Sequence, residues 1–324
     1  MPAPSVVSMT APPAPPAHPS SDVPPTHTTA SGAAAAPGAS TNPTVPTVTA
    51  SSAHLAPAPS PRGVLLLAGA PLLLLTAVCG AFLVADVPVP SWAVLVGRWI
   101  PALVSLIVLW PALRRPGGLR TVLVPAWGLR RSRGTRGGAV ALSAAGVAVV
   151  LVVAVVTAAL SDAVGAMTVQ PWGTVALGVA LMLPLIPILA LSTLGEEVVW
   201  RSHLPRLLGG TFWRRSLLIA LIWMAFHVPL HLTYVLQGDM SAAHAAATTV
   251  GLLPLSLFLS ALTARQGSVW PAAIAHAVPI TGVTLAADAA GIDPAAMWTI
   301  TLVGAVLMLS AAMALAPSRD AHER

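Results

Sequence analysis

The sequence predicts an all-α protein that crosses the membrane several times, and three observations support this fold class. Hydrophobic residues make up 56% of the chain and charged residues only 8%, whereas soluble domains carry about 25% charged residues. Mean hydropathy is +0.83. The apolar residues form continuous runs of about 20 residues, the length that a membrane-spanning helix needs. These runs lack the alternation of barrel strands, so we expect a polytopic transmembrane helix bundle.

Residues 1–61 are predicted to form a disordered N-terminal tail. This segment consists mainly of Pro, Ala, Ser and Thr, and its one acidic residue is Asp22. It has no apolar period that a core could bury, and it lacks the basic start and compact apolar stretch of a signal peptide. We therefore expect a spacer that takes no part in catalysis.

Apolar runs long enough to span the membrane follow this tail along most of the remaining chain. They predict a bundle of about eight spans at residues 62–317, followed by a short cytoplasmic tail at 318–324. The eight runs are 63–85, 92–113, 138–160, 174–198, 216–236, 242–263, 268–287 and 297–316.

The distribution of arginine predicts how this bundle is oriented. The chain has no lysine, and most arginines lie in the loops after the second, fourth, sixth and eighth runs, whereas the other loops carry aspartates. By the positive-inside rule we expect both termini to be cytoplasmic and the protein to lie in the plasma membrane. Arg98 falls inside the second run, and we expect it to snorkel to the interface. Nucleic-acid binding is not expected, because the arginines do not share one polar face.

Two adjacent glutamates at the end of the fourth run are the first functional candidates, because ionisable side chains within a span are costly. Glu197 and Arg201 are four residues apart, so on a helix they can form an ion pair. Glu196 points about 100° away from that pair. We therefore expect the two carboxylates to differ in proton affinity, with Glu196 as a general base beside a structural partner. The alternative is an interfacial salt bridge without chemistry.

Histidines inside the apolar runs are the second set of candidates. Trp223, His227 and His231 recur every four residues, and His276 follows a Gly-Ser-Val-Trp-Pro segment. Counted from the arginine-flanked ends of their runs, His227 and His276 lie roughly 14–17 Å deep, near the middle of a core about 30 Å thick. Glu196 is expected at a similar depth, so the three predict one buried site that opens toward the cytoplasm. The alternative is that the histidines are hydrogen-bonded packing residues.

These elements, in this order, resemble the CPBP family of intramembrane proteases, which includes the CAAX-prenyl endopeptidase Rce1 and bacterial Abi proteins. The pattern of that family is Glu-Glu-x-x-x-Arg, then Phe-x-x-x-His, then His-x-x-x-Asn on successive core helices. The resemblance covers roughly residues 175–285, the expected peptidase core. The matching residues are Glu196, Glu197 and Arg201 for the first motif, Trp223 and His227 for the second with tryptophan replacing phenylalanine, and His276 for the third.

The third motif is incomplete in this chain. Ile280 stands where the family has asparagine, and the one asparagine of the sequence is Asn42 in the tail. In the family this asparagine is thought to help stabilise the oxyanion, and losing one such donor costs about 10²–10³ in rate. Either Thr281 or Thr284 substitutes for it, or the enzyme is slow, altered in specificity or inactive.

The resemblance implies hydrolysis of a peptide bond in a peptide or a membrane-anchored protein. Glu196 would remove a proton from a water held by His227, and His276 would polarise the scissile carbonyl. Glu197 and Arg201 would fix the geometry of the site. Two histidines and one glutamate also form a catalytic zinc set, so the pattern predicts either a divalent metal held by Glu196, His227 and His276 or glutamate-activated water without metal. The alternatives are a non-catalytic scaffold or immunity-type protein derived from this family, and a proton-coupled transporter.

Overall fold

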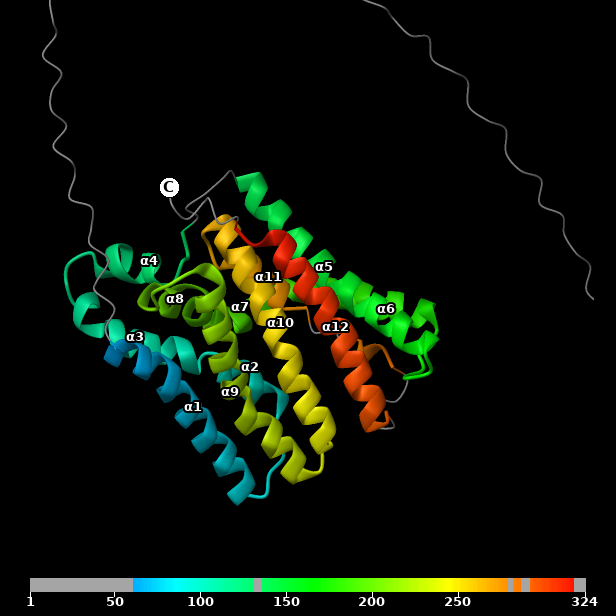
Figure 1. Cartoon of the computed structure of the whole chain (residues 1–324). Coiled ribbons are helices and arrows are strands. Elements are labelled where there is room, and N and C mark those ends of the chain that lie inside the picture. Colours follow the sequence, from blue (N-terminus) through cyan, green and yellow to red (C-terminus); the bar gives the residue numbers. More distant parts are fainter. Residues whose placement is uncertain (1–60, 131–135, 279–281, 287–291, 318–324) are drawn as a thin grey trace, which may run out of the picture. The chain divides into compact units, whose positions relative to one another are not determined.

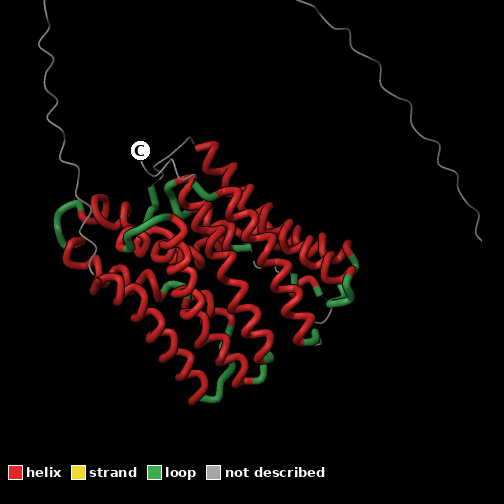
Figure 2. The backbone as a smooth tube through the Cα atoms, viewed as in Figure 1, coloured by secondary structure: helices red, strands yellow, loops and turns green. Residues whose placement is uncertain are grey.

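A computed structural model of the chain describes residues 61–130, 136–278, 282–286 and 292–317. Helices dominate the described residues (Figures 1 and 2), and the only strand-like feature among them is one isolated antiparallel bridge between Val169 and Ala286. The predicted all-α fold is therefore confirmed. The predicted tails at 1–61 and 318–324 lie outside the described residues, apart from Pro61.

The described residues contain seven helical segments that are long and apolar enough to cross a membrane. The protein is therefore a multi-pass membrane protein. The segments are Pro61–Val84 (α1), Ser91–Leu113 (α2, Ser91–Gly97, and α3, Ile100–Leu113), Gly137–Ala163 (within α5, Arg136–Ala163), Trp172–Leu207 (α6 to α8), Phe212–Gln237 (α9), Ala242–Gln266 (α10) and Pro294–Leu315 (α12).

The eighth predicted span, residues 268–287, is not one continuous helix in its described part, which is why seven candidate spans are found there and not eight. Only Trp270–His276 (α11) and the 3-10 turn Val283–Leu285 (η4) are helical in its described part. Helix α11 ends shortly before Pro279, and proline biases the preceding residue away from the helical conformation. Helix α11 packs against α5, α7 and α10 inside the bundle, which accounts for its apolar residues.

Two non-α segments interrupt the fourth span. Helix α6 (Trp172–Met182) passes through a 3-10 turn at Leu183–Leu185 (η2) into α7 (Ile186–Glu197). A π-helix at Val198–His203 (η3) then leads into α8, Leu204–Leu207. All residues of the π-helix are buried. Because π-helical segments are rare and often occur at functional sites, η3 marks this turn of the fourth span as unusual.

The connection between α3 and α5 contains a second π-helix, Leu119–Leu123 (η1), and a short helix, Val124–Ala126 (α4). The hydrophobic core lies around η3, α9, α10 and α11, and its largest fully buried side chains include Trp200, Trp223 and Phe258. Large apolar side chains on the outer helices are exposed, as Leu73 of α1 and Val306 of α12 are. This inside-out distribution suits a protein whose surroundings are lipid.

Charged residues separate between the two ends of the bundle. Helices α1 and α9 run side by side in the same direction (Figure 1). Their last residues lie together, since Gln237 at the end of α9 donates to the carbonyl of Val87 just after α1. We call the end with Arg62, Arg206, Arg214, Arg215 and Arg265 the arginine end, and the end with Asp86, Asp162, Asp239 and Asp293 the aspartate end. The positive-inside rule predicts that the arginine end is cytoplasmic.

Candidate active site

Glu196 lies in the last turn of α7 and is completely buried. Its neighbour Gly195 allows α7 to approach the junction of α2 and α3. A Cβ atom at Gly195 would lie 2.6 Å from the backbone oxygen of Arg98 and 2.8 Å from the Cα atom of Trp99, so a larger residue would not fit. This close approach brings the Arg98 side chain to the Glu196 carboxylate, with Nε 3.6 Å from Oε1.

The two carboxylate oxygens of Glu196 have different surroundings. Oε2 accepts a hydrogen bond from the indole Nε1 of Trp223 in α9, at 2.5 Å. Oε1 has no hydrogen-bond partner in the part of the chain that the structure describes, and the ion-pair distance to Arg98 is too long for a hydrogen bond. One oxygen therefore fixes the carboxylate through a hydrogen bond, and the other faces the Arg98 guanidinium.

His227 lies one turn after Trp223 in α9, and its ring nitrogens have separate roles. Nδ1 is 2.8 Å from the carbonyl oxygen of Trp223. A carbonyl only accepts hydrogen bonds, so we assign the hydrogen to Nδ1, which leaves Nε2 of the neutral ring as an acceptor. Nε2 lies 3.9 Å from Oε2 of Glu196. This distance suits two groups that share one water molecule.

Glu197 is held by an arginine and a histidine. Its Oε2 accepts from Nε of Arg201 at 3.0 Å, and its Oε1 lies 2.8 Å from Nδ1 of His276, the last residue of α11. Nη1 of Arg201 donates to Ser256 of α10 at 2.8 Å. The ion pair predicted from the four-residue spacing is present, although it forms across the start of a π-helix rather than within an α-helix.

The Trp223 ring contacts both parts of this cluster, the Glu196–His227 pair and the group formed by Glu197, Arg201 and His276. It lies edge-on to the rings of His227 and His276, with centroid distances of 5.1 and 5.2 Å. The guanidinium of Arg201 lies 5.0 Å from the centroid of the same ring. The structure therefore brings together all five site residues that the sequence singles out, from the α7–η3 turn, α9 and α11.

Glu196, His227 and His276 line one cavity of about 270 Å³. Its other walls come from the second halves of α1 and α9 and from α2, and they include Cys79, Arg98 and Tyr234. These parts of the helices lie toward the aspartate end. The expected opening toward the cytoplasm stays a prediction, because residue counts give the depth of these side chains but not the direction in which the cavity opens.

Arg98 is the functional candidate that the sequence analysis missed, because it was expected to snorkel to the interface. Its side chain instead points into the bundle, where it lines the cavity beside Glu196 and remains 29% exposed. The available signal was its position inside an apolar run, where an ionisable residue is a functional candidate by default. His231 also lines this cavity, and its Nδ1 pairs with Oγ1 of Thr249 at 2.7 Å.

Of the two threonines proposed to replace the missing asparagine, the structure describes Thr284 alone. Ile280 and Thr281 lie outside the described residues. Thr284 belongs to the 3-10 turn η4, is exposed, and is not among the residues that line the cavity. The structure therefore does not support Thr284 as the substitute.

The predicted metal ligands Glu196, His227 and His276 line one cavity. Among the described residues, no group of three His, Cys, Asp or Glu side chains is arranged to hold a metal ion, and Oε2 of Glu196 accepts from the Trp223 indole. A bound divalent metal stays a prediction, which metal analysis of the purified protein tests.

Replacing Trp223 by phenylalanine tests the hydrogen bond that fixes Glu196. The variant keeps an aromatic ring but removes the donor to a fully buried carboxylate, so we expect the free energy of unfolding to fall by about 1–3 kcal/mol. Trp200→Phe is the matched control, because Trp200 is equally buried but its Nε1 has no partner among the described residues. Unfolding in detergent should show the larger loss for Trp223→Phe; equal losses would refute the importance of this bond.

Comparison with known proteins gives one match. Residues 146–279 match the family model described as type II CAAX prenyl endopeptidase Rce1-like. No curated protein and no solved structure matches the chain. The matched segment contains the whole cluster from Glu196 to His276, and it confirms the resemblance that the three motifs predict.

Proposed function

We propose that this chain, whose residues 146–279 belong to the Rce1-like family of type II CAAX prenyl endopeptidases, is an intramembrane endopeptidase that hydrolyses its substrate with a glutamate-activated water. The observation that carries this proposal is the buried carboxylate of Glu196 beside His227 in a single cavity. An isolated ionisable side chain at this depth is costly, whereas a carboxylate that lines a cavity beside a histidine can serve as a base.

In the proposed reaction, a water molecule lies between Glu196 and Nε2 of His227. Glu196 removes one proton from this water, and the oxygen attacks the carbonyl carbon of the scissile peptide bond. The electrons of the carbonyl double bond move onto its oxygen. When the carbonyl re-forms, the bond from carbon to nitrogen breaks, and the proton from Glu196 passes to the leaving amine. Water is consumed, and a carboxylic acid and an amine are released; the acid then gives its proton to the amine, which leaves a carboxylate and an ammonium group.

The group formed by Glu197, Arg201 and His276 polarises the carbonyl of the scissile peptide bond. In its doubly protonated form, His276 donates from Nδ1 to Glu197 and from Nε2 toward the carbonyl oxygen. Glu197 and Arg201 do not touch the substrate in this scheme, because Glu197 is already bonded to both Arg201 and His276. They are positioning residues that hold the imidazole ring at the cavity.

Arg98 supplies the donor that Ile280 cannot provide. Its guanidinium carries several N–H donors, borders the cavity and lies within ion-pair distance of the catalytic base. A charged donor aimed at the developing oxyanion stabilises the transition state more than the ground state. In this scheme Arg98, the residue that follows α2, takes the role of the missing asparagine amide.

Replacing Arg98 by methionine should lower kcat by about 10²–10³-fold. Stability should also fall, because the fully buried Glu196 loses its arginine partner, so kcat is compared on folded protein only. Arg98→Lys should keep part of the rate, since it retains a charged donor. Adding Ile280→Asn to Arg98→Met should restore part of the loss. Wild-type kcat in Arg98→Met would rule out this role.

Purified full-length protein in lipid nanodiscs, given a quenched-fluorescent peptide library with and without a membrane anchor, tests the proposed function. We expect cleavage at a defined bond of an anchored or free peptide. A folded protein that cleaves no member of the library would favour the scaffold alternative, and solute uptake by proteoliposomes without cleavage would favour the transporter.

A further inference from the structure

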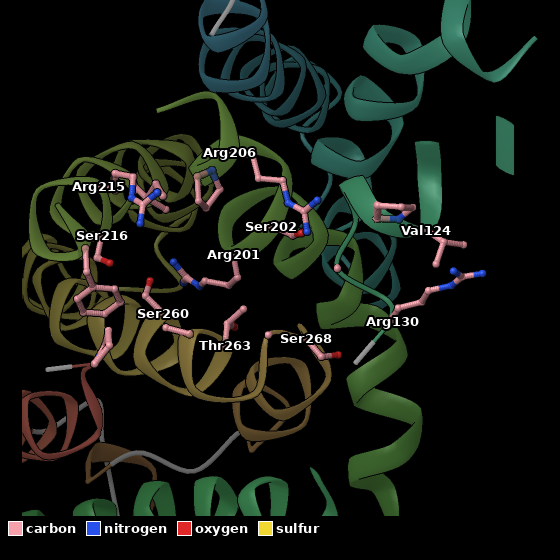
Figure 3. Close-up of a pocket in the computed structure, with 18 residues that line it drawn as sticks. Val124, Arg130, Arg201, Ser202, Arg206, Arg215, Ser216, Ser260, Thr263 and Ser268 are labelled. Carbon is pink, nitrogen blue, oxygen red and sulfur yellow. The ribbon is translucent and has the colours of Figure 1, made fainter. Parts of the chain in front are cut away.

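A second, larger cavity of about 500 Å³ lies at the arginine end (Figure 3). Its walls come from α4 and the residues after it, from η3 and α8, and from the start of α9 and the end of α10. The lining includes four arginines, which are Arg130, Arg201, Arg206 and Arg215, together with hydroxyl groups such as those of Ser202 and Ser268.

Arg201 is paired with Glu197, but the described part of the chain gives two other arginines of this cavity no acidic partner. No acidic residue lines the cavity. The described acidic residues are the four aspartates of the aspartate end and the two glutamates of the active-site cluster. Arg130 and Arg206 have no hydrogen-bond or ion-pair partner among the described residues, and both are exposed. The cavity therefore attracts an anion.

Buried polar atoms at the base of the cavity also lack partners. The Ser268 side chain is 2% exposed, and its Oγ has no hydrogen-bond partner in the described structure. Nη2 of the buried Arg201 has none there either. A buried donor that is left unpaired costs roughly 1–3 kcal/mol, so these atoms indicate a ligand that would accept their hydrogen bonds.

The chemistry and the position of the cavity identify the ligand class. Arginine forms paired, charge-assisted hydrogen bonds to phosphate. Basic pockets between transmembrane helices at a membrane surface bind anionic lipid headgroups, and apolar residues such as Phe212 and Ile219 complete the lining. We propose that this cavity binds a phosphate group, as carried by an anionic phospholipid or by free phosphate. Arg201 connects it to the active-site cluster through Glu197.

Thermal unfolding of the full-length protein in a neutral detergent tests this proposal, because a ligand that binds only the folded state raises Tm. The probes are short-chain phosphatidylglycerol, phosphatidylcholine of the same chain length, and inorganic phosphate. We expect a saturable rise in Tm with phosphatidylglycerol and none with phosphatidylcholine, whose choline compensates the phosphate charge. A rise with inorganic phosphate as well would identify the free anion as a sufficient ligand.

Matched arginine variants locate the site. Arg206→Gln and Arg130→Gln should each weaken the apparent Kd for phosphatidylglycerol about fivefold, the loss expected for one arginine. Arg265→Gln removes the same charge from the same end but lies outside the cavity, so its Kd should stay near that of the wild type. If all three variants respond equally, or if no probe gives a saturable shift, the proposal is wrong. Using two exposed cavity arginines guards against one variant that fails to fold.

Discussion

Replacing Glu196 by glutamine is expected to lower the rate of peptide hydrolysis by about 10²–10⁴-fold, the usual contribution of a general base. Glutamine has nearly the same shape as glutamate, and its carbonyl oxygen can still accept the hydrogen bond from Trp223. It cannot remove a proton from water. Stopped assays with a quenched-fluorescent peptide give kcat, and thermal unfolding of the same sample shows whether the bundle is intact.

Asp239→Asn is a suitable control for this experiment, because it neutralises one carboxylate at the exposed aspartate end. Its kcat should match that of the wild type. The assignment of Glu196 as base fails if Glu196→Gln, folded and at equal concentration, cleaves the peptide at the wild-type rate.

The second large effect concerns stability. Replacing Arg201 by methionine leaves the fully buried Glu197 without its cation, and breaking a buried ion pair by removing one partner costs about 3–5 kcal/mol. Ser256→Ala is the milder comparison, since it removes only the hydroxyl that accepts from Nη1 of Arg201. Denaturant unfolding in mixed micelles measures the free energy of unfolding for each variant.

A double variant separates loss of the ion pair from loss of packing. Adding Glu197→Gln to Arg201→Met removes the unpaired charge, so we expect it to recover part of the lost stability. Losses that simply add in the double variant, or an Arg201→Met protein as stable as the wild type, would contradict the view that this pair holds the site together.

The sequence predicts most spans because backbone groups in lipid find no water to bond, so a long apolar run must form a helix. The run at 268–287 shows the limit of this reasoning. Hydropathy alone cannot distinguish a helix surrounded by lipid from one surrounded by protein, and α11 is buried against α5 and α7. The π-helix at Val198–His203 was also missed, because its residues have no spacing that differs from an α-helix.

Much of the candidate site is predictable for a related reason. Ionisable residues are so rare in the apolar runs that Glu196, Glu197, His227 and His276 stand out in the sequence. Local spacing also predicts the pair of Glu197 with Arg201. Long-range packing decides the rest: the position of Arg98 depends on the contact of Gly195 with a distant helix junction. The indole hydrogen bond of Trp223 likewise depends on how α9 rotates against α7.

Hydrolysis in water enriched in ¹⁸O tests most directly whether the buried carboxylate activates water for attack on a peptide bond. The purified protein is incubated with its anchored peptide, and the products are analysed by mass spectrometry. We predict that each cleavage places one ¹⁸O atom in the new carboxylate, and that Glu196→Gln forms almost no labelled product. Product without the label, or labelled product formed equally fast by Glu196→Gln, would contradict this account.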